Sequence, residues 1–150
     1  MSGGERDRGW LLAHLPQKGA MNLLERIDRW TDEEIACTAR SHLATGHPLR
    51  CGDLVPSCAA IEYAAQAVAA HGALLAGDGG TAGAGFLASA RAVDLHVSRL
   101  DDLGGPLAIH ARRLSGDASG MLYEFRVACG TAPVASGRLA IALGAAGVSA

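Results

Sequence analysis

The chain has 150 residues, of which 49% are hydrophobic, and its formal net charge at neutral pH is −2. This length is typical of one domain, and the apolar content is sufficient to build a core. The nearly balanced charge gives no electrostatic reason to expect nucleic acid or an acidic surface as a partner. We therefore expect a single domain over residues 1–150 that does not bind nucleic acid.

The sequence also bears on location and metal chemistry. The N-terminal stretch carries charges but no apolar run followed by a small-residue cleavage site, so it makes a poor signal peptide. The most apolar run contains Glu62 and His71, which argues against a membrane span and leaves the cytoplasm as the expected location. The four cysteines (37, 51, 58 and 129) form no CxxC pair, which predicts reduced thiols and no metal site. Cys58 is a candidate reactive thiol, because a helix N-terminus can lower a thiol pKa.

In chain order, residues 23–30 suit either a strand or a helical turn, and periodicity does not decide between them. Ile35, Cys37 and Ala39 then alternate with more polar neighbours, as in a half-buried strand. Residues 42–56 are rich in glycine and proline and are predicted to form a loop.

A helical pattern follows over residues 57–75. Pro56 and Ser57, at a cap-like position, are good start signals. Both flanks of this helix are apolar, around a narrow polar stripe of Glu62 and Gln66. We therefore expect the helix to be surrounded by the rest of the domain.

The remainder of the chain is predicted to be a glycine-rich loop followed by strands. Residues 77–85 lack the Lys-Ser/Thr ending of a phosphate-binding loop. Alternating apolar residues then predict strands near 86–97, 107–112, 123–127 and 135–143, with a hairpin turn at 130–133. One long buried helix followed by antiparallel strands is an α+β layout, with the sheet wrapped around the helix.

Two residues carry the functional interpretation. Glu62 is the single carboxylate on an apolar helix, and a buried carboxylate is costly unless it is paired or used. His47 lies in the preceding loop, in the sequence Gly46-His47-Pro48. The other histidines (14, 42, 71, 96 and 110) are interpreted as structural, with His42 as the main competitor for a catalytic role.

This pattern resembles the hot-dog-fold 3-hydroxyacyl-acyl-carrier-protein dehydratases. In that family a G-H-(x)n-P-G loop precedes a helix carrying Glu or Asp, followed four residues later by Gln. Residues 14–27 and 86–88 are also similar to the corresponding segments of the family. Here Ser57 replaces the glycine after the proline, and the loop is one residue longer. The form HPLR … LxP … IEYxAQxxAxH is more similar to the branch associated with bacterial aryl-polyene clusters.

The resemblance implies a role for each site residue in removing water from a 3-hydroxyacyl thioester. His47 takes the C2 proton, and Glu62, with a pKa raised by its apolar surroundings, protonates the departing hydroxyl. Gln66, one turn along, orients Glu62. Backbone N–H groups at the helix start, near Ser57 and Cys58, form the oxyanion hole.

The resemblance also implies an assembly and a substrate carrier. Two hot-dog domains join their sheets edge to edge, so that His47 of one protomer faces Glu62 of the other. A homodimer and a heterodimer with a homologous subunit both remain open. The substrate is expected on the phosphopantetheine arm of an acyl-carrier protein, with no other cofactor, although coenzyme A is an alternative carrier. A cis bond between His47 and Pro48 is also expected.

Two other functions stay open. A hot-dog thioesterase uses a helix carboxylate to activate water, but such enzymes usually lack the loop histidine. A non-catalytic or heterodimer-dependent partner subunit would keep the fold and need a second chain. The length of the acyl chain, its aryl or alkyl character, and any isomerase activity are not determined by the sequence.

Overall fold

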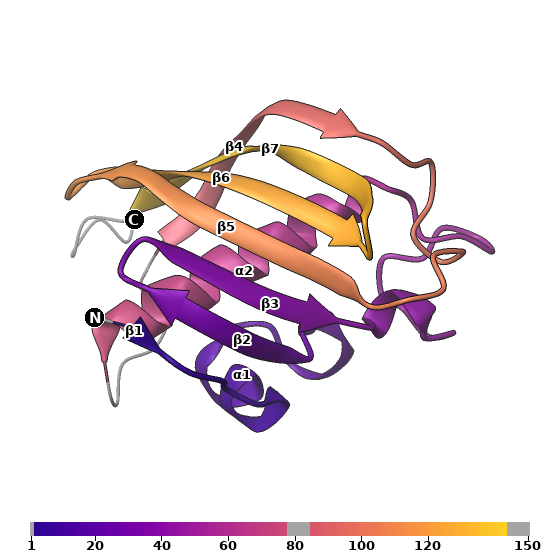
Figure 1. Cartoon of the computed structure of the whole chain (residues 1–150), viewed down its shortest axis with the longest axis horizontal. Helices are drawn as coiled ribbons and strands as arrows, with labels where there is room; N and C mark the ends of the chain where they lie inside the picture. Colours follow the sequence, from indigo (N-terminus) through magenta and orange to yellow (C-terminus); the bar gives the residue numbers. More distant parts are fainter. Residues whose placement is uncertain (1, 78–84, 144–150) are drawn as a thin grey trace, which may run out of the picture.

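The computed structural model describes residues 2–77 and 85–143. These residues form a seven-stranded antiparallel sheet in the order β1-β2-β3-β5-β6-β7-β4, with the long helix α2 against one face (Figure 1). The strands are β1 (Ser2–Gly3), β2 (Arg26–Thr31), β3 (Glu34–Ala39), β4 (Gly85–Leu95), β5 (Leu107–Gly116), β6 (Gly120–Cys129) and β7 (Ala132–Leu143). The α+β layout and the strands expected after the helix are confirmed. The stretch at 23–30, which periodicity left open, is mostly strand, because β2 covers its residues from 26 onward.

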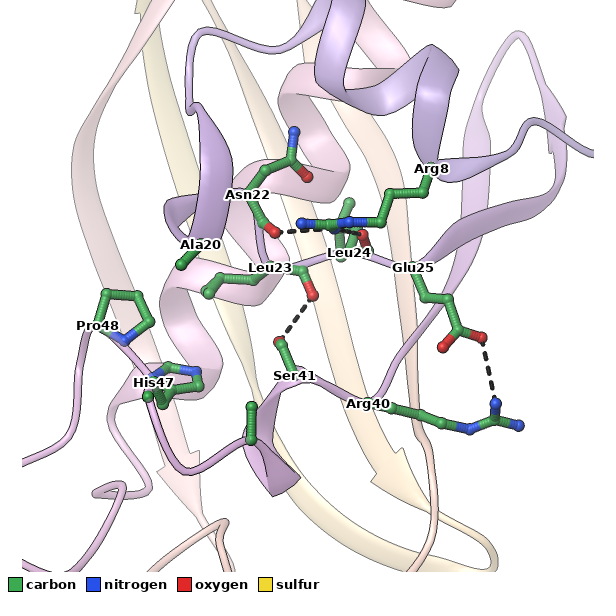
Figure 2. Close-up of a pocket in the computed structure, with 12 residues that line it drawn as sticks. Arg8, Ala20, Asn22, Leu23, Leu24, Glu25, Arg40, Ser41, His47 and Pro48 are labelled. Atoms are coloured by element: carbon green, nitrogen blue, oxygen red, sulfur yellow. Dashed lines mark hydrogen bonds and ion pairs between the residues drawn. The ribbon is translucent and has the colours of Figure 1, made fainter.

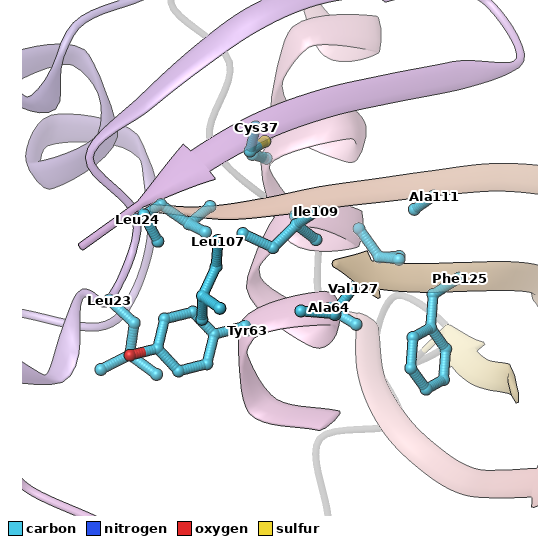
Figure 3. Packing of buried hydrophobic residues seen from close by; sticks show 14 of the residues in the cluster. Leu23, Leu24, Cys37, Tyr63, Ala64, Leu107, Ile109, Ala111, Phe125 and Val127 are labelled. Carbon is cyan, nitrogen blue, oxygen red and sulfur yellow. The ribbon is translucent and has the colours of Figure 1, made fainter. Parts of the chain in front are cut away.

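The core lies between α2 (Ala59–Ala76) and the sheet. The alternation expected in β3 is confirmed, because Ile35, Cys37 and Ala39 are all buried. The neighbouring strands β5 and β6 contribute Leu107, Ile109, Ala111, Tyr123, Phe125 and Val127 to the same layer (Figure 3). Burial of these side chains is the main favourable contribution to the stability of the fold.

Helix α2 is not enclosed on every side. Most of its residues are buried, including Gln66 and His71. Ile61, Ala65 and Ala69, however, are only partly buried in the single chain. The expectation of a fully surrounded helix is therefore met on the sheet side only, and an apolar stripe beside Glu62 stays accessible.

The start of α2 differs from the sequence prediction. The helix begins at Ala59, and Cys58 occupies the N-cap position without a side-chain capping bond. Ser57 therefore lies one residue before the cap, and its backbone N–H donates to the Ser98 carbonyl at 3.2 Å. The helix ends at Gly77, which has a φ of +84°, a conformation that glycine adopts without steric cost.

Three short helical segments connect the strands. They are α1 (Arg8–His14), η1 (Gly19–Met21) and η2 (Ser41–Leu43). Helix α1 was not expected from the sequence. Its N-cap is Asp7, whose side chain accepts a hydrogen bond from the Trp10 N–H at 2.9 Å.

Strand β4 is a long edge of the sheet, paired on one side with β7. The register of this pair shifts twice, and Ala92 in the second shift has a φ of +50°. Several side chains near the end of β4 are exposed, Leu95 among them at 43% of its surface. An exposed edge of this length is a natural site for pairing with another chain.

The glycine-rich loop predicted at 77–85 lies, over residues 78–84, outside the described part of the chain. Among the described helices, none is both long and apolar enough to cross a membrane. In residues 2–77 and 85–143, no three metal-ligating side chains are grouped closely enough to hold an ion.

Candidate functional site

His47 lies buried in the loop before α2, with 5% of its surface exposed. The loop turns sharply here: the Leu49 N–H donates to His47 Nδ1 at 3.0 Å, and the Arg50 N–H donates to the His47 carbonyl at 3.1 Å. On its other side, His47 Nε2 lies 2.9 Å from the hydroxyl of Tyr63. Burial lowers the pKa of His47, and the positive charge of Arg50 lowers it further.

Tyr63 extends this contact into a chain of hydroxyl groups. Its hydroxyl lies 2.7 Å from Ser41 Oγ, which donates to the Leu23 carbonyl at 2.8 Å. Tyr63 is fully buried on α2, and this burial raises its pKa to about 12. The hydroxyl therefore stays protonated at neutral pH and acts as a hydrogen-bonding group.

Glu62 and Gln66 meet on the adjacent face of α2, as their spacing predicted. Gln66 Nε2 donates to Glu62 Oε1 at 3.1 Å and to the Met21 carbonyl at 2.7 Å. Gln66 Oε1 accepts a hydrogen bond from the Leu23 N–H at 2.8 Å. The amide is therefore held by three partners, and it fastens the segment before β2 onto the helix while orienting Glu62.

The loop that leads into α2 is tied to the segment before β5. Asp101 accepts a hydrogen bond from the Val55 N–H at 2.8 Å and forms an ion pair with Arg99. Ser57, one of the two residues expected to supply an oxyanion amide, already donates its N–H to the Ser98 carbonyl. The backbone N–H of Cys58, whose side chain is exposed, is the remaining candidate for that role.

A pocket of about 280 Å³ opens beside His47 (Figure 2). Its wall includes His47 and Leu23, the two ends of this series of hydrogen bonds, together with Ser41. The Arg8 side chain stiffens this wall, because it donates to the carbonyls of Asn22 and Leu24 at 3.0 and 2.6 Å. The backbone that forms this wall is therefore held by Arg8 on one side and by Ser41 on the other.

The structure brings the predicted residues into two adjacent pairs. His47 contacts Tyr63, whereas Glu62 contacts Gln66, and within the described residues no hydrogen bond joins His47 to Glu62. The expected cis bond before Pro48 is wrong, since every described peptide bond is trans.

Sequence analysis missed Tyr63 and Ser41. Tyr63 stands next to Glu62 on the apolar flank of the predicted helix, and a buried tyrosine hydroxyl usually finds a hydrogen-bond partner. That rule gives a signal that a polar group lies within reach of position 63. It does not tell which residue supplies that group.

The other buried histidines have structural surroundings. His71 Nε2 lies 2.7 Å from the Thr31 carbonyl, and its Nδ1 lies 2.6 Å from the Tyr123 hydroxyl. His42 Nε2 lies 3.1 Å from the Leu103 carbonyl. Neither histidine has a contact with Glu62 among the described hydrogen bonds.

The sequence of this chain matches one known protein family over most of its length. A family model described as ApeP-like, ApeP dehydratase, matches residues 11–145. The chain belongs to the ApeP-like dehydratase family. The resemblance to hot-dog dehydratases of the aryl-polyene branch is thereby confirmed. No curated protein matches the sequence.

Solved structures support the hot-dog fold of this ApeP-like chain. The dehydratase heterocomplex ApeI:P from Xenorhabdus doucetiae matches with a TM-score of 0.76 and 24% identity, over 89% of this chain and 90% of the other. A mutant of the thioesterase PA1618 from Pseudomonas aeruginosa matches with a TM-score of 0.59 and 16% identity, over 92% and 94%. A hypothetical thioesterase with coenzyme A from Streptococcus pneumoniae matches with a TM-score of 0.56 and 11% identity, over 78% and 83%. At these identities the likeness concerns the fold.

Proposed function

We propose that this ApeP-like chain is one subunit of a dehydratase that converts a 3-hydroxyacyl thioester on an acyl-carrier protein to the trans-2-enoyl thioester. The pathway that fits the family is aryl-polyene biosynthesis. The observation that carries the proposal is the pair of consecutive helix residues, Glu62 and Tyr63. Glu62 is held by Gln66, and Tyr63 is held by His47.

The proposed chemistry needs one base and one acid. His47 accepts the C2 proton, and the electrons of the broken C–H bond form the C2–C3 double bond. The C3–O bond breaks, and Glu62 in its protonated form donates a proton to the departing oxygen, which leaves as water. A proton passes from His47 back to Glu62 through solvent before the next turnover.

Gln66 and Cys58 have supporting roles in this proposal. Because Gln66 Nε2 donates to Glu62 Oε1, the other carboxyl oxygen is the one that carries the transferred proton. Negative charge develops on the thioester oxygen as C2 loses its proton. The Cys58 N–H, at the positive end of α2, is the group proposed to stabilise that charge.

A second hot-dog subunit is part of the proposal. His47 and Glu62 of one chain belong to separate hydrogen-bonded pairs, and Ile61, Ala65 and Ala69 leave an apolar stripe accessible beside Glu62. The exposed edge of β4 offers backbone groups for joining two sheets. The ApeI:P structure is a heterocomplex, which favours a homologous subunit over a second copy of this chain.

The test is an assay with a 3-hydroxyacyl thioester loaded on an acyl-carrier protein, in which mass spectrometry follows the loss of water. The chain is assayed alone and after co-expression with a homologous hot-dog subunit. We expect turnover from the complex, and a loss of at least about a hundredfold in His47→Ala and in Glu62→Gln. Glu124→Gln is the matched control, because Glu124 pairs with Arg112 on the opposite face of the sheet.

Two results would redirect the proposal. A complex that keeps full turnover with both His47→Ala and Glu62→Gln would make this chain a non-catalytic partner. Release of free thiol from the thioester, without loss of water, would favour a thioesterase function, the activity by which two of the structural neighbours are described.

A further inference from the structure

In the hydrogen bonds around His47, the donor and the acceptor can be assigned, because the groups at both ends of the series can act in only one way. The Leu49 N–H is a donor and cannot accept, so Nδ1 of His47 must be the acceptor of that 3.0 Å bond. A neutral imidazole has one acceptor nitrogen and one N–H. The proton of neutral His47 therefore lies on Nε2, which donates to the Tyr63 hydroxyl at 2.9 Å.

The hydrogen bond at the far end of this series, between Ser41 and Leu23, also has a fixed direction. The Leu23 carbonyl can only accept, so the Ser41 hydroxyl donates to it. Ser41 Oγ then accepts from Tyr63, and Tyr63 in turn accepts from His47. The two assignments, made from opposite ends, agree. The His47 ring, the two hydroxyl groups and the Leu23 carbonyl can all be hydrogen-bonded only when the donors point from His47 towards Leu23.

We propose that Tyr63 and Ser41 are positioning residues that hold the proton of His47 on Nε2, so that Nδ1 is the nitrogen that accepts the substrate proton. The inference rests on the proposed dehydratase function for its last step. The assignment of the Nε2 proton stands on the hydrogen bonds alone.

The arrangement suits a base that gains a positive charge. When Nδ1 takes up a proton, the bond from Nε2 to Tyr63 becomes charge-assisted and therefore stronger. Ser41 and the Leu23 carbonyl polarise the Tyr63 hydroxyl in the direction that accepts this charge. Tyr63 does not take the proton itself, because it is neutral and already bonded.

The Leu49 N–H occupies Nδ1 in the isolated chain, and the substrate has to replace it. This contact is part-buried and spans only two residues of one turn, next to the exposed Pro48, whereas Tyr63 is fully buried on α2. The Nε2 atom of the ring is thus bonded to the core, whereas Nδ1 is bonded only to the backbone of its own turn. The nitrogen that can be uncovered without disturbing the core is the one proposed as the base.

A second buried histidine–tyrosine pair provides a matched control. The Thr31 carbonyl accepts from Nε2 of His71, so Nδ1 of His71 accepts from the Tyr123 hydroxyl at 2.6 Å. Tyr123 is as deeply buried as Tyr63 but donates to its histidine instead of accepting. Replacing either tyrosine with phenylalanine removes one buried hydroxyl, and only one of them touches His47.

The first experiment is nitrogen-15 NMR of the full chain with labelled histidine, with His47→Asn used to assign the signals. We expect neutral His47 to show a proton on Nε2 and an unprotonated Nδ1. A proton on Nδ1 of the wild-type ring would overturn the inference. This readout does not depend on activity, so it decides the proton position even if the complex does not dehydrate the substrate.

The second experiment compares kcat/KM against pH for the active complex. In Tyr63→Phe we expect turnover to fall about tenfold or more, because a hydrogen bond to a charged group is lost. We also expect its acidic limb to move to lower pH, because protonated His47 loses an acceptor. The groups facing His47, namely Arg50, His42 and Leu49, are the same in both proteins.

The remaining variants separate positioning from packing. Ser41→Ala should move the acidic limb of kcat/KM in the same direction by a smaller amount. If Tyr63→Phe does not fold, this variant still tests the series of hydrogen bonds. Tyr123→Phe should leave the limb in place. Unchanged turnover and an unchanged limb in both Tyr63→Phe and Ser41→Ala would overturn the positioning role. An inactive wild-type complex would count against the proposed function instead.

Discussion

The side-chain amide of Gln66 accepts a hydrogen bond from the backbone N–H of Leu23 at 2.8 Å, across 43 residues of sequence. The same amide donates to the Met21 carbonyl and to Glu62. One buried side chain thus holds the pocket wall against α2 and orients the carboxylate that we propose as the acid. Its structural and functional roles are inseparable.

Replacement of Gln66 by Ala should therefore be costly. It leaves the buried Leu23 N–H without its partner, which costs about 1–3 kcal/mol, and it also removes the part-buried bond to the Met21 carbonyl and the contact with Glu62. We expect urea unfolding to show a loss of about 2–4 kcal/mol. Gln17→Ala is the control, because the Gln17 side-chain oxygen has no hydrogen-bond partner. Equal stability of the two variants would contradict this account.

The folded chain should lose stability as the pH falls below neutrality. Burial lowers the pKa of His42, His47 and His71 from the ordinary value of 6.5. The unfolded chain consequently binds protons near pH 6.5 that the folded chain does not, so stability is complete above 6.5 and declines below it. Urea midpoints measured from pH 8 to pH 5 should fall steadily.

His71→Gln should weaken that pH dependence by removing one of the three groups. His96→Gln, at an exposed position, should leave the slope unchanged. A urea midpoint that stays constant or rises from pH 8 to pH 5 would show that these histidines do not control how the stability of the fold changes in acid.

Asp101 should matter for the loop that leads into α2. Its bonds with Arg99 and with the Val55 N–H hold its pKa well below the usual range for aspartate, so it is charged throughout the physiological pH range. Asp101→Ala should speed hydrogen exchange at the Val55 amide and lower turnover several-fold, because the loop also carries the proposed oxyanion amide. Asp102→Ala, at the exposed neighbouring position, should change neither measurement.

The core should respond to truncation as a closely packed layer does. Ile109 lies on β5 against α2 with 1% of its surface exposed. Ile109→Ala should destabilise the protein by about 2–5 kcal/mol through lost burial and the cavity left behind. Leu114→Ala, further along the same strand at an exposed position, should stay within about 0.5 kcal/mol of the wild type. Similar losses in the two variants would argue against the placement of the core.

The parts of this protein that depend on local periodicity could be predicted from the amino-acid sequence. The alternation in β3 and β7, the extent of α2 to within two residues at its start, and the i,i+4 contact of Glu62 with Gln66 all follow from the repeat of a strand or a helix. The resemblance to the family rests on the same repeat, since the motif combines the loop histidine with a Glu and a Gln four residues apart on the helix.

The contacts of His47 could not be predicted in this way, because they depend on how distant elements pack together. Tyr63, Ser41 and Leu23 come from α2, η2 and the segment before β2, and no local pattern encodes a meeting of elements so far apart in sequence. Likewise, the partner of the Ser57 N–H is the Ser98 carbonyl, which is 41 positions further along the chain. Hydrogen bonds of this kind form because burial leaves polar groups no water to bond, and the packing of the whole fold chooses their partners.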